Sequence, residues 1–141
     1  MNPHIGSSLS GLLAEIVHVK QSTDASCVQA CLAMYLGMPI GVVFTHLHPR
    51  DSGTKHKAMI DFLHRNGVEC AGRMTSAMGK TLPEVALVRI TWANKKAHIV
   101  LKVGRTWHDP LFDKPFTGDL PKDRAWSGGG RVTSFLALPS R

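Results

Sequence analysis

The sequence has few charged side chains, few cysteines and no long apolar run. No apolar stretch approaches the roughly 18 residues that a membrane-spanning helix needs. There is no heptad pattern and no repeat of roughly 20 to 50 residues, which excludes coiled coils and solenoids. Hydrophobic residues make up 43% of the 141 residues and charged residues only 19%, a balance that excludes a disordered chain. We therefore predict one domain over residues 16–141, preceded by a loosely structured lead-in over residues 1–15.

Acidic side chains are scarce relative to basic ones. The sequence has 10 Asp and Glu residues against 17 Lys and Arg residues, which gives a net charge of +7. Such an excess is typical of proteins that bind nucleic acid, a membrane surface or an anionic polymer such as cell wall. The positive residues are scattered, and the nearest approaches to a cluster are Lys95 with Lys96, and Lys55 with Lys57. We therefore expect no nucleic-acid partner and no transmembrane segment.

The three cysteines, Cys27, Cys31 and Cys70, show no CxxC spacing and are odd in number. This pattern argues against a disulfide framework. The N-terminal stretch has no basic region, and Glu15 interrupts its apolar part, so a cleaved secretory signal is not expected. These features predict a cytoplasmic protein, or one exported without a cleaved signal peptide. They leave the oligomeric state open.

Helical periodicity comes first along the chain and strand periodicity second, which predicts an α+β fold. The expected helices run from residue 27 to Gly37, with an apolar stripe that starts at residue 28, and from residue 54 to about residue 66. Residues 40–48 are ambiguous. A two-residue turn at Gly104 and Arg105 is expected to join two antiparallel strands. The expected strands cover residues 16–20, 68–74, 85–92, 97–103, 106–109 and 131–138.

Cys27 is a candidate nucleophile because of its place at a helix start. Ser26 and Gln29 fit the S-x-x-Q pattern of a capping box, which would make Cys27 the first helical residue. Unpaired N–H groups and the helix dipole favour the thiolate form there, and the thiolate is the reactive form. The alternative is that Cys27 is a small buried hydrophobic residue. Cys31, on the apolar stripe, and Cys70 are expected to be buried and inert.

His98 and Asp109 are candidates for the base and for its orienting group. His98 opens an apolar strand, and Asp109 lies on the returning limb of the expected hairpin. Simple register places position 111 opposite His98, so Asp109 needs a diagonal contact or a small bulge to reach the ring. The alternatives are a hydrogen-bonded core histidine and a turn-forming Asp-Pro pair. Gln21, six residues before Cys27, could donate to an oxyanion together with the Cys27 N–H, or could be a surface glutamine.

These residues together resemble a known family. The string QSTDASCVQACLAM, which carries Gln21, Cys27, Cys31 and Met34, resembles the opening of the bacteriocin-processing leader peptidases. These are bacterial papain-like cysteine peptidases that usually precede export transporters. The family has Gly after the nucleophile, where this chain has Val28. Further stretches that resemble the family are residues 51–54, 66–68, 82–88, 97–101, 109–110 and 126–128.

The resemblance implies a stand-alone papain-like fold, with helices packed on an antiparallel sheet, that needs no cofactor and no metal. In this interpretation Cys27 attacks an amide carbonyl of a peptide or protein, and His98 acts as base and acid. Asp109 would hold the imidazole tautomer, and Gln21 would stabilise the oxyanion. Val28 is expected to narrow the substrate groove.

Other functions stay open at this point. Peptidoglycan amidases of the CHAP type also place Cys at a helix start and His on a strand, and a basic protein suits an anionic wall. A toxin or effector that deamidates or cleaves a host protein, and a non-catalytic peptide-binding module, are further alternatives. A metal site at His46 and His48, with Asp51 or His56, is weighed against a polar loop, which we expect. The glycines at 128–130 lack the Lys-Ser/Thr of a phosphate loop.

Overall fold

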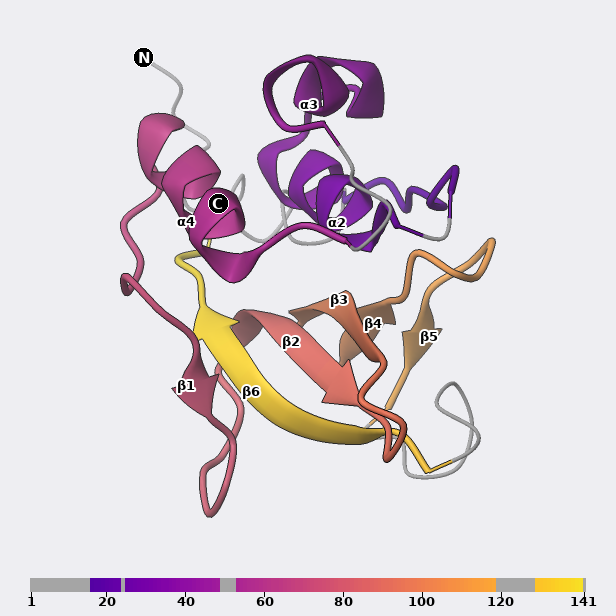
Figure 1. The fold of residues 1–141 in the computed structure, drawn as a ribbon, viewed down its shortest axis with the longest axis vertical. Helices are drawn as coiled ribbons and strands as arrows, with labels where there is room; N and C mark the ends of the chain where they lie inside the picture. The colour runs from indigo at the N-terminus through magenta and orange to yellow at the C-terminus, as the bar shows by residue number, and fades with distance from the viewer. Residues whose placement is uncertain (1–15, 24, 49–52, 119–128, 141) are drawn as a thin grey trace, which may run out of the picture.

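Helices lie on one side of an antiparallel sheet in the computed structural model, which describes residues 16–23, 25–48, 53–118 and 129–140 (Figure 1). The helices there are α2 (Cys27–Leu36), α3 (Ile40–His46) and α4 (His56–Arg65). The strands are β1 (Thr75–Ser76), β2 (Val85–Thr91), β3 (Ala97–Val103), β4 (Thr106–His108), β5 (Phe116–Thr117) and β6 (Arg131–Ala137). The predicted α+β class is confirmed.

The sheet has the strand order β1-β6-β2-β3-β4-β5, and all its pairings are antiparallel. The strand nearest the C-terminus, β6, therefore lies between β1 and β2 rather than at the end of a simple meander. The turn between β3 and β4 is the expected two-residue one, because Val103 pairs with Thr106. Gly104 has φ +61 in this turn, a conformation that glycine adopts without steric cost.

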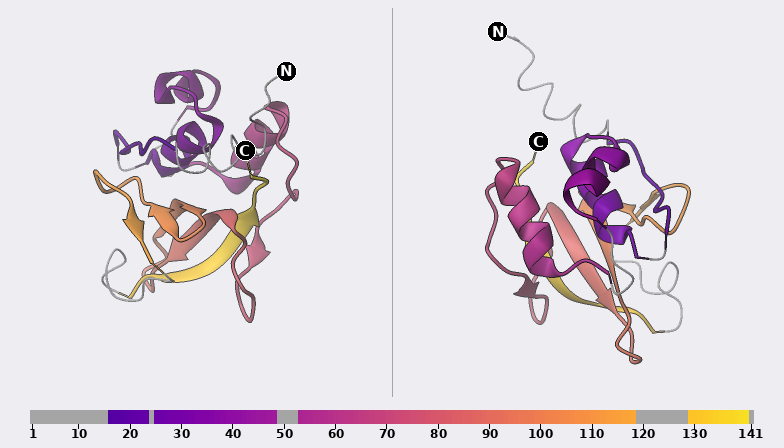
Figure 2. Two further views of the ribbon diagram at one scale, coloured as in Figure 1. Left: turned by 180° about the vertical axis from the view of Figure 1, so that it is seen from behind. Right: turned by 45° about the horizontal axis from the view of Figure 1, so that its top comes forward.

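The helix α2 is buried all round, which corrects the amphipathic helix expected from its apolar spacing. Every residue from Val28 to Tyr35 is buried, including Gln29, because α2 lies between α3 and the strand β3. Figure 2 shows the same two layers from behind and tilted with the top forward, with the helices covering one face of the sheet. The helix ends as expected at Gly37, which has φ +67, and the amide of Met38 donates to the Ala33 carbonyl.

Two expected strands do not form. Residues 16–20 pair with none of the strands that the structure describes, and Val17 is 75% exposed, so alternation over only five residues did not reflect a buried face. Residues 68–74 are irregular because the chain is still closing α4: Gly67, at φ +79, and Val68 donate to the carbonyls of His64 and Leu63. The short strand β1 follows directly after this irregular stretch.

Three further expectations have different outcomes. The ambiguous residues 40–48 contain the helix α3. The helix α4 begins at His56, with Lys55 as N-cap, rather than at residue 54 as expected. The lead-in at residues 1–15 and the family-like residues 126–128 lie outside the described residues.

Among the described residues no single helix has the length and apolar character to cross a membrane, although α2 and α3, bent by 118°, pass that test when taken together.

Candidate active site

The hairpin of β3 and β4 brings His98 and Asp109 together. The last ladder pair is Leu101 with His108, so continued pairing would place residue 111 opposite His98, as the sequence predicts. The ladder stops at His108 instead, and the next residues form a tight turn in which the Phe112 amide donates to the Asp109 carbonyl. Asp109 thereby makes the diagonal contact, with its Oδ1 2.6 Å from His98 Nε2.

Both partners of this contact are buried. His98 is 7% exposed and Asp109 is fully buried. Asp109 Oδ1 also accepts the Leu111 N–H at 3.0 Å. The other carboxylate oxygen, Oδ2, is buried and has no hydrogen-bond partner among the described residues. The orientation of the carboxylate therefore depends on Oδ1 and on the backbone turn that carries it.

Cys27 is the first residue of α2, as predicted, but the predicted capping box is wrong. The Ser26 hydroxyl donates to the Thr23 carbonyl and accepts the Thr23 N–H instead of capping the helix. Gln29 points away to the Leu47 carbonyl and the Thr54 hydroxyl. Within the described part of the chain, α2 thus has no side-chain cap and no acid in its first turn. Its N-terminal N–H groups are left to interact with an anion at Cys27.

The pKa of His98 links Cys27 to the His98–Asp109 pair. Burial lowers this pKa, but hydrogen bonds from the ring to Asp109 and to Cys27, with the charges of both groups, raise it to about 9. Because Nε2 is bonded to Asp109, Nδ1 is the ring nitrogen available to Cys27. The three side chains therefore interact in the order Cys27, His98 and Asp109, an arrangement that can activate a thiol nucleophile.

Gln21 lies beside the turn that carries Asp109. Its backbone N–H donates to the Pro110 carbonyl at 2.8 Å, and its side-chain amide donates to the Thr23 carbonyl at 2.7 Å. An amide nitrogen carries two protons, so one proton remains for a substrate oxygen. The structure thus places Gln21 next to the site, with its amide already held by the loop that leads into α2.

The other two cysteines differ from Cys27. Cys31 is fully buried, and its thiol donates to the Ile99 carbonyl at 3.5 Å. Burial raises the pKa of Cys31 well above its ordinary value, and the nearby Cys27 and Asp109 raise it further. Cys70 is half-buried rather than buried in a strand, and burial raises its pKa too. Both environments disfavour a reactive thiolate.

One contact at this site has no signal in the sequence. His18 and His108, 90 residues apart, stack with ring centroids 5.3 Å apart, and their Nδ1 atoms lie 3.1 Å from each other. His108 immediately precedes Asp109. Trp107 is buried in the sheet and Trp92 is half-buried.

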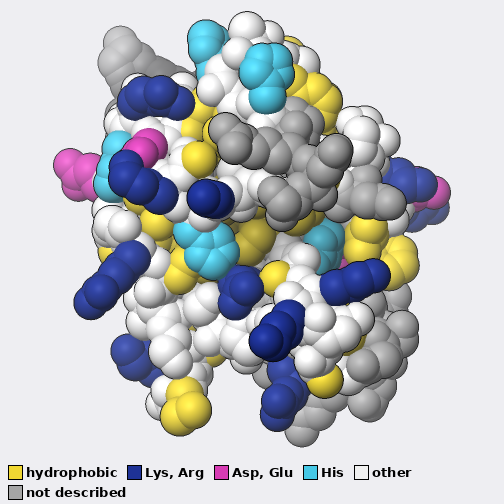
Figure 3. All heavy atoms as spheres, viewed as in Figure 1, with side chains coloured by type: hydrophobic (Ala, Val, Ile, Leu, Met, Phe, Trp, Pro, Cys, Tyr) yellow, Lys and Arg dark blue, Asp and Glu magenta, His cyan; other side chains and the backbone are white. Residues whose placement is uncertain are grey.

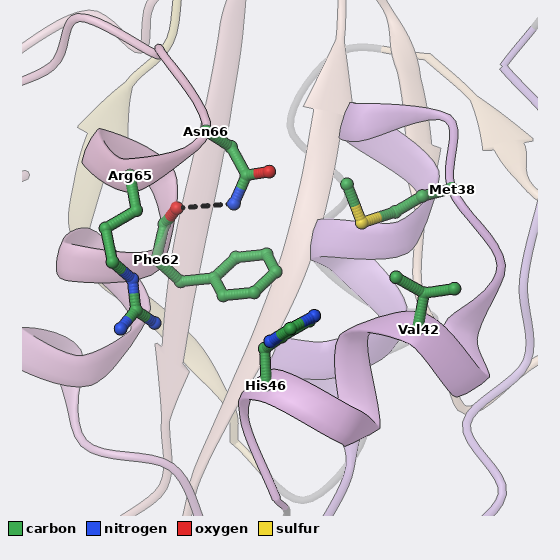
Figure 4. A pocket seen from close by; sticks show the side chains of 6 residues that line it. All are labelled: Met38, Val42, His46, Phe62, Arg65 and Asn66. Atoms are coloured by element: carbon green, nitrogen blue, oxygen red, sulfur yellow. Dashed lines mark hydrogen bonds between the residues drawn. The ribbon is translucent and has the colours of Figure 1, made fainter.

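Among the residues that the structure describes, no group of three or more His, Cys, Asp or Glu side chains is arranged so that it could hold a metal ion. Asp51, one of the weighed ligands, lies outside those residues. A pocket of about 320 Å³ lies between α3 and α4 (Figure 4), but its lining does not include Cys27, His98, Asp109 or Gln21. It is lined by Met38, Val42, His46, Phe62, Arg65 and Asn66.

The raised pKa of His98 predicts how the stability of the fold depends on pH. The folded-state pKa of about 9 lies above the ordinary value of 6.5, so the charged ring contributes stability that is complete below about pH 6.5. This contribution is lost as the pH rises through about 9. We expect urea unfolding of the wild type to show the free energy falling over that range, and His98→Gln to lose most of the fall. An identical fall in the free energy of unfolding of both proteins would show that His98 is not the group responsible.

A scan against protein-family models finds no match for this chain, and a search of the curated proteins finds none either.

Proposed function

We propose that the protein is a papain-like cysteine hydrolase, most simply a peptidase. The observation that carries the proposal is the 2.6 Å contact of His98 with Asp109, together with the Cys27 side chain, whose interaction with the same ring raises the His98 pKa. The nucleophile comes from the first turn of a buried helix and the base from the adjoining sheet. The resemblance of the Gln21 to Met34 stretch to leader peptidases supports the same chemistry.

The proposed reaction has two steps. The Cys27 thiolate attacks the substrate carbonyl carbon, and the Cys27 N–H and the Gln21 amide donate to the resulting oxyanion. Protonated His98 gives its proton to the leaving amine as the C–N bond breaks, which leaves a thioester on Cys27. Neutral His98 then takes a proton from water, whose oxygen attacks the thioester. The acid product leaves, and the thiolate and the charged ring are restored.

Asp109 makes this cycle possible by holding the ring. Its bond to Nε2 keeps a proton on that nitrogen, so Nδ1 is the atom that exchanges a proton with Cys27 and the substrate. Burial excludes water from this contact, which strengthens it. A module that only binds peptides has no need of all three groups in contact.

A peptidoglycan amidase is the second candidate, and the surface charge favours it. Lys and Arg side chains are spread over the face drawn in Figure 3, with few Asp or Glu among them. Lys95 and Lys96 are exposed in the turn that leads directly to His98. An anionic wall polymer would be attracted to such a surface.

Selective alkylation tests the proposed nucleophile. We expect iodoacetamide at about pH 6 to modify Cys27 at least tenfold faster than Cys31 or Cys70, because only Cys27 contacts an imidazolium. Peptide mapping by mass spectrometry measures the three rates in one sample, so Cys31 and Cys70 are internal controls. Equal rates at Cys27 and Cys70 would overturn the proposal.

Once Cys27 is shown to be selective, the substrate class can be separated. A peptide library and purified peptidoglycan sacculi are incubated with the wild type and with Cys27→Ser. Cysteine-dependent cleavage of peptides supports the peptidase, whereas release of wall fragments supports the amidase. A wall activity that does not weaken with added salt would count against recognition by surface charge.

A further inference from the structure

The N-terminal segment, defined as residues 16–21, is held against the turn that carries Asp109. It forms no strand there, so single contacts hold it. Lys20 forms an ion pair with Asp113 at 3.2 Å on the surface, and the backbone N–H of Gln21 donates to the Pro110 carbonyl. Ile16 and Val19 pack against the main hydrophobic core, and His18 supplies the side-chain hydrogen bonds to the turn.

His18 connects the two ends of this turn. Its Nε2 lies 2.6 Å from the Phe112 carbonyl oxygen and its Nδ1 lies 3.1 Å from Nδ1 of His108. A carbonyl only accepts, so His18 Nε2 carries a proton and donates it. In the neutral ring Nδ1 is then the acceptor, and His108 Nδ1 donates to it. One imidazole thereby satisfies groups on both sides of Asp109.

Asp109 needs this support because its carboxylate is held on one side only. Oδ1 accepts from Leu111 and contacts His98, while Oδ2 has no partner among the described residues. The placement of Oδ1 therefore follows the placement of residues 108–112. A small displacement of that turn would lengthen the 2.6 Å contact to His98. Such displacements are costly in catalysis, because reacting groups must stay within hydrogen-bond reach.

We propose that His18 is a positioning residue of the active site: through its bonds to His108 and Phe112 it holds the turn that presents Asp109 to His98. The same segment carries Gln21, so one anchor places both the orienting carboxylate and the candidate oxyanion donor. The kinetic consequence rests on the proposed function, whereas the effect on the His98 ring does not.

The protonation state of His108 suits this contact. Burial, and then the neighbouring His18, lower the pKa of His108 to about 4. The His108 ring is therefore neutral at about pH 7, and one of its neutral tautomers carries the Nδ1 proton that it donates to His18.

His18→Phe and His18→Gln test the proposal as a matched pair. Phe keeps a flat ring against His108 but removes both hydrogen bonds. The Gln amide offers an acceptor and a donor at a similar spacing to the two ring nitrogens, so it can keep both bonds. Lys20→Ala is the control, since it removes an exposed ion pair from the same segment and such pairs contribute little.

Two readouts are measured on each variant: the His98 pKa by NMR titration, and kcat and KM on a substrate found for the wild type. We expect His18→Phe to lower the His98 pKa from about 9 toward 6.5 and to reduce kcat about tenfold with little change in KM. His18→Gln and Lys20→Ala should match the wild type in both readouts. If His18→Phe does not fold, His18→Ala is read in the same way.

The outcomes separate this proposal from the proposed function. An unchanged His98 pKa in a folded His18→Phe overturns the positioning role, even if the enzyme is active. A His18→Gln variant that behaves like His18→Phe also overturns the positioning role, because the hydrogen bonds of His18 would then not be what holds the His98 pKa. If wild-type Cys27 shows no selective alkylation, the proposed function fails, but the His98 titration still decides the role of His18.

Discussion

Replacing Cys27 by serine is expected to reduce substrate hydrolysis by roughly 10⁴- to 10⁶-fold, the loss that follows when a covalent nucleophile is removed. The serine hydroxyl is close to the thiol in size, so the fold should be unchanged. His98 would face a neutral group instead of a thiolate and would stop activating the nucleophile. Initial rates on the substrate found by library screening measure the effect.

Cys70→Ser is the matched control for this prediction. Cys70 is half-buried, and its pKa is raised by burial alone, so the same exchange there should leave the rate within about twofold of the wild type. Thermal unfolding of both variants separates chemistry from stability. A Cys27→Ser protein that retains wild-type activity would show that hydrolysis, if present, does not proceed through Cys27.

Asp109 is expected to give the second large effect, and its two substitutions should differ in kind. Asp109→Ala removes the acceptor from His98 Nε2, so the ring loses both its orientation and its charge partner. We expect kcat/KM to fall by roughly 10²- to 10⁴-fold. Asp109→Asn keeps an acceptor oxygen at nearly the same position, so its loss should be smaller.

The pH profile distinguishes charge from orientation at Asp109. The carboxylate raises the pKa of His98, so its removal in either variant lowers that pKa. The basic limb of kcat/KM should then move from about pH 9 to lower pH in both variants, although only Asp109→Ala loses orientation. Asp113→Asn, an exposed acid four residues on, should leave the limb in place. An unmoved limb in Asp109→Asn would contradict the assignment.

The local features of the site follow from sequence, because they depend on short-range physics. The helix boundary at Cys27 is confirmed, as is the two-residue turn at Gly104 and Arg105. That turn places residue 111 opposite His98, from which the diagonal contact of Asp109 follows. The helix end at Gly37 is confirmed for the same reason, since glycine tolerates the left-handed conformation.

Tertiary contacts account for what the sequence did not predict. The capping box does not form because the Ser26 hydroxyl hydrogen-bonds to Thr23 and the Gln29 amide hydrogen-bonds to Thr54. The apolar stripe predicted only one buried face of α2. All its faces are buried because neighbouring elements cover the others as well. The contact of His18 with His108 joins residues 90 apart, and no local pattern specifies such a pair. Gln21 is placed near the site, but its catalytic role remains a prediction.

The most direct test of the central claim is the ultraviolet absorbance of the Cys27 thiolate at about pH 6. The Cys-His ion pair predicts about one equivalent of thiolate in the wild type at that pH. The signal should be absent from Cys27→Ser and from His98→Ala, and unchanged in Cys70→Ser. A wild type with no thiolate at about pH 6, or a signal that survives in Cys27→Ser, would contradict the claim that His98 activates Cys27.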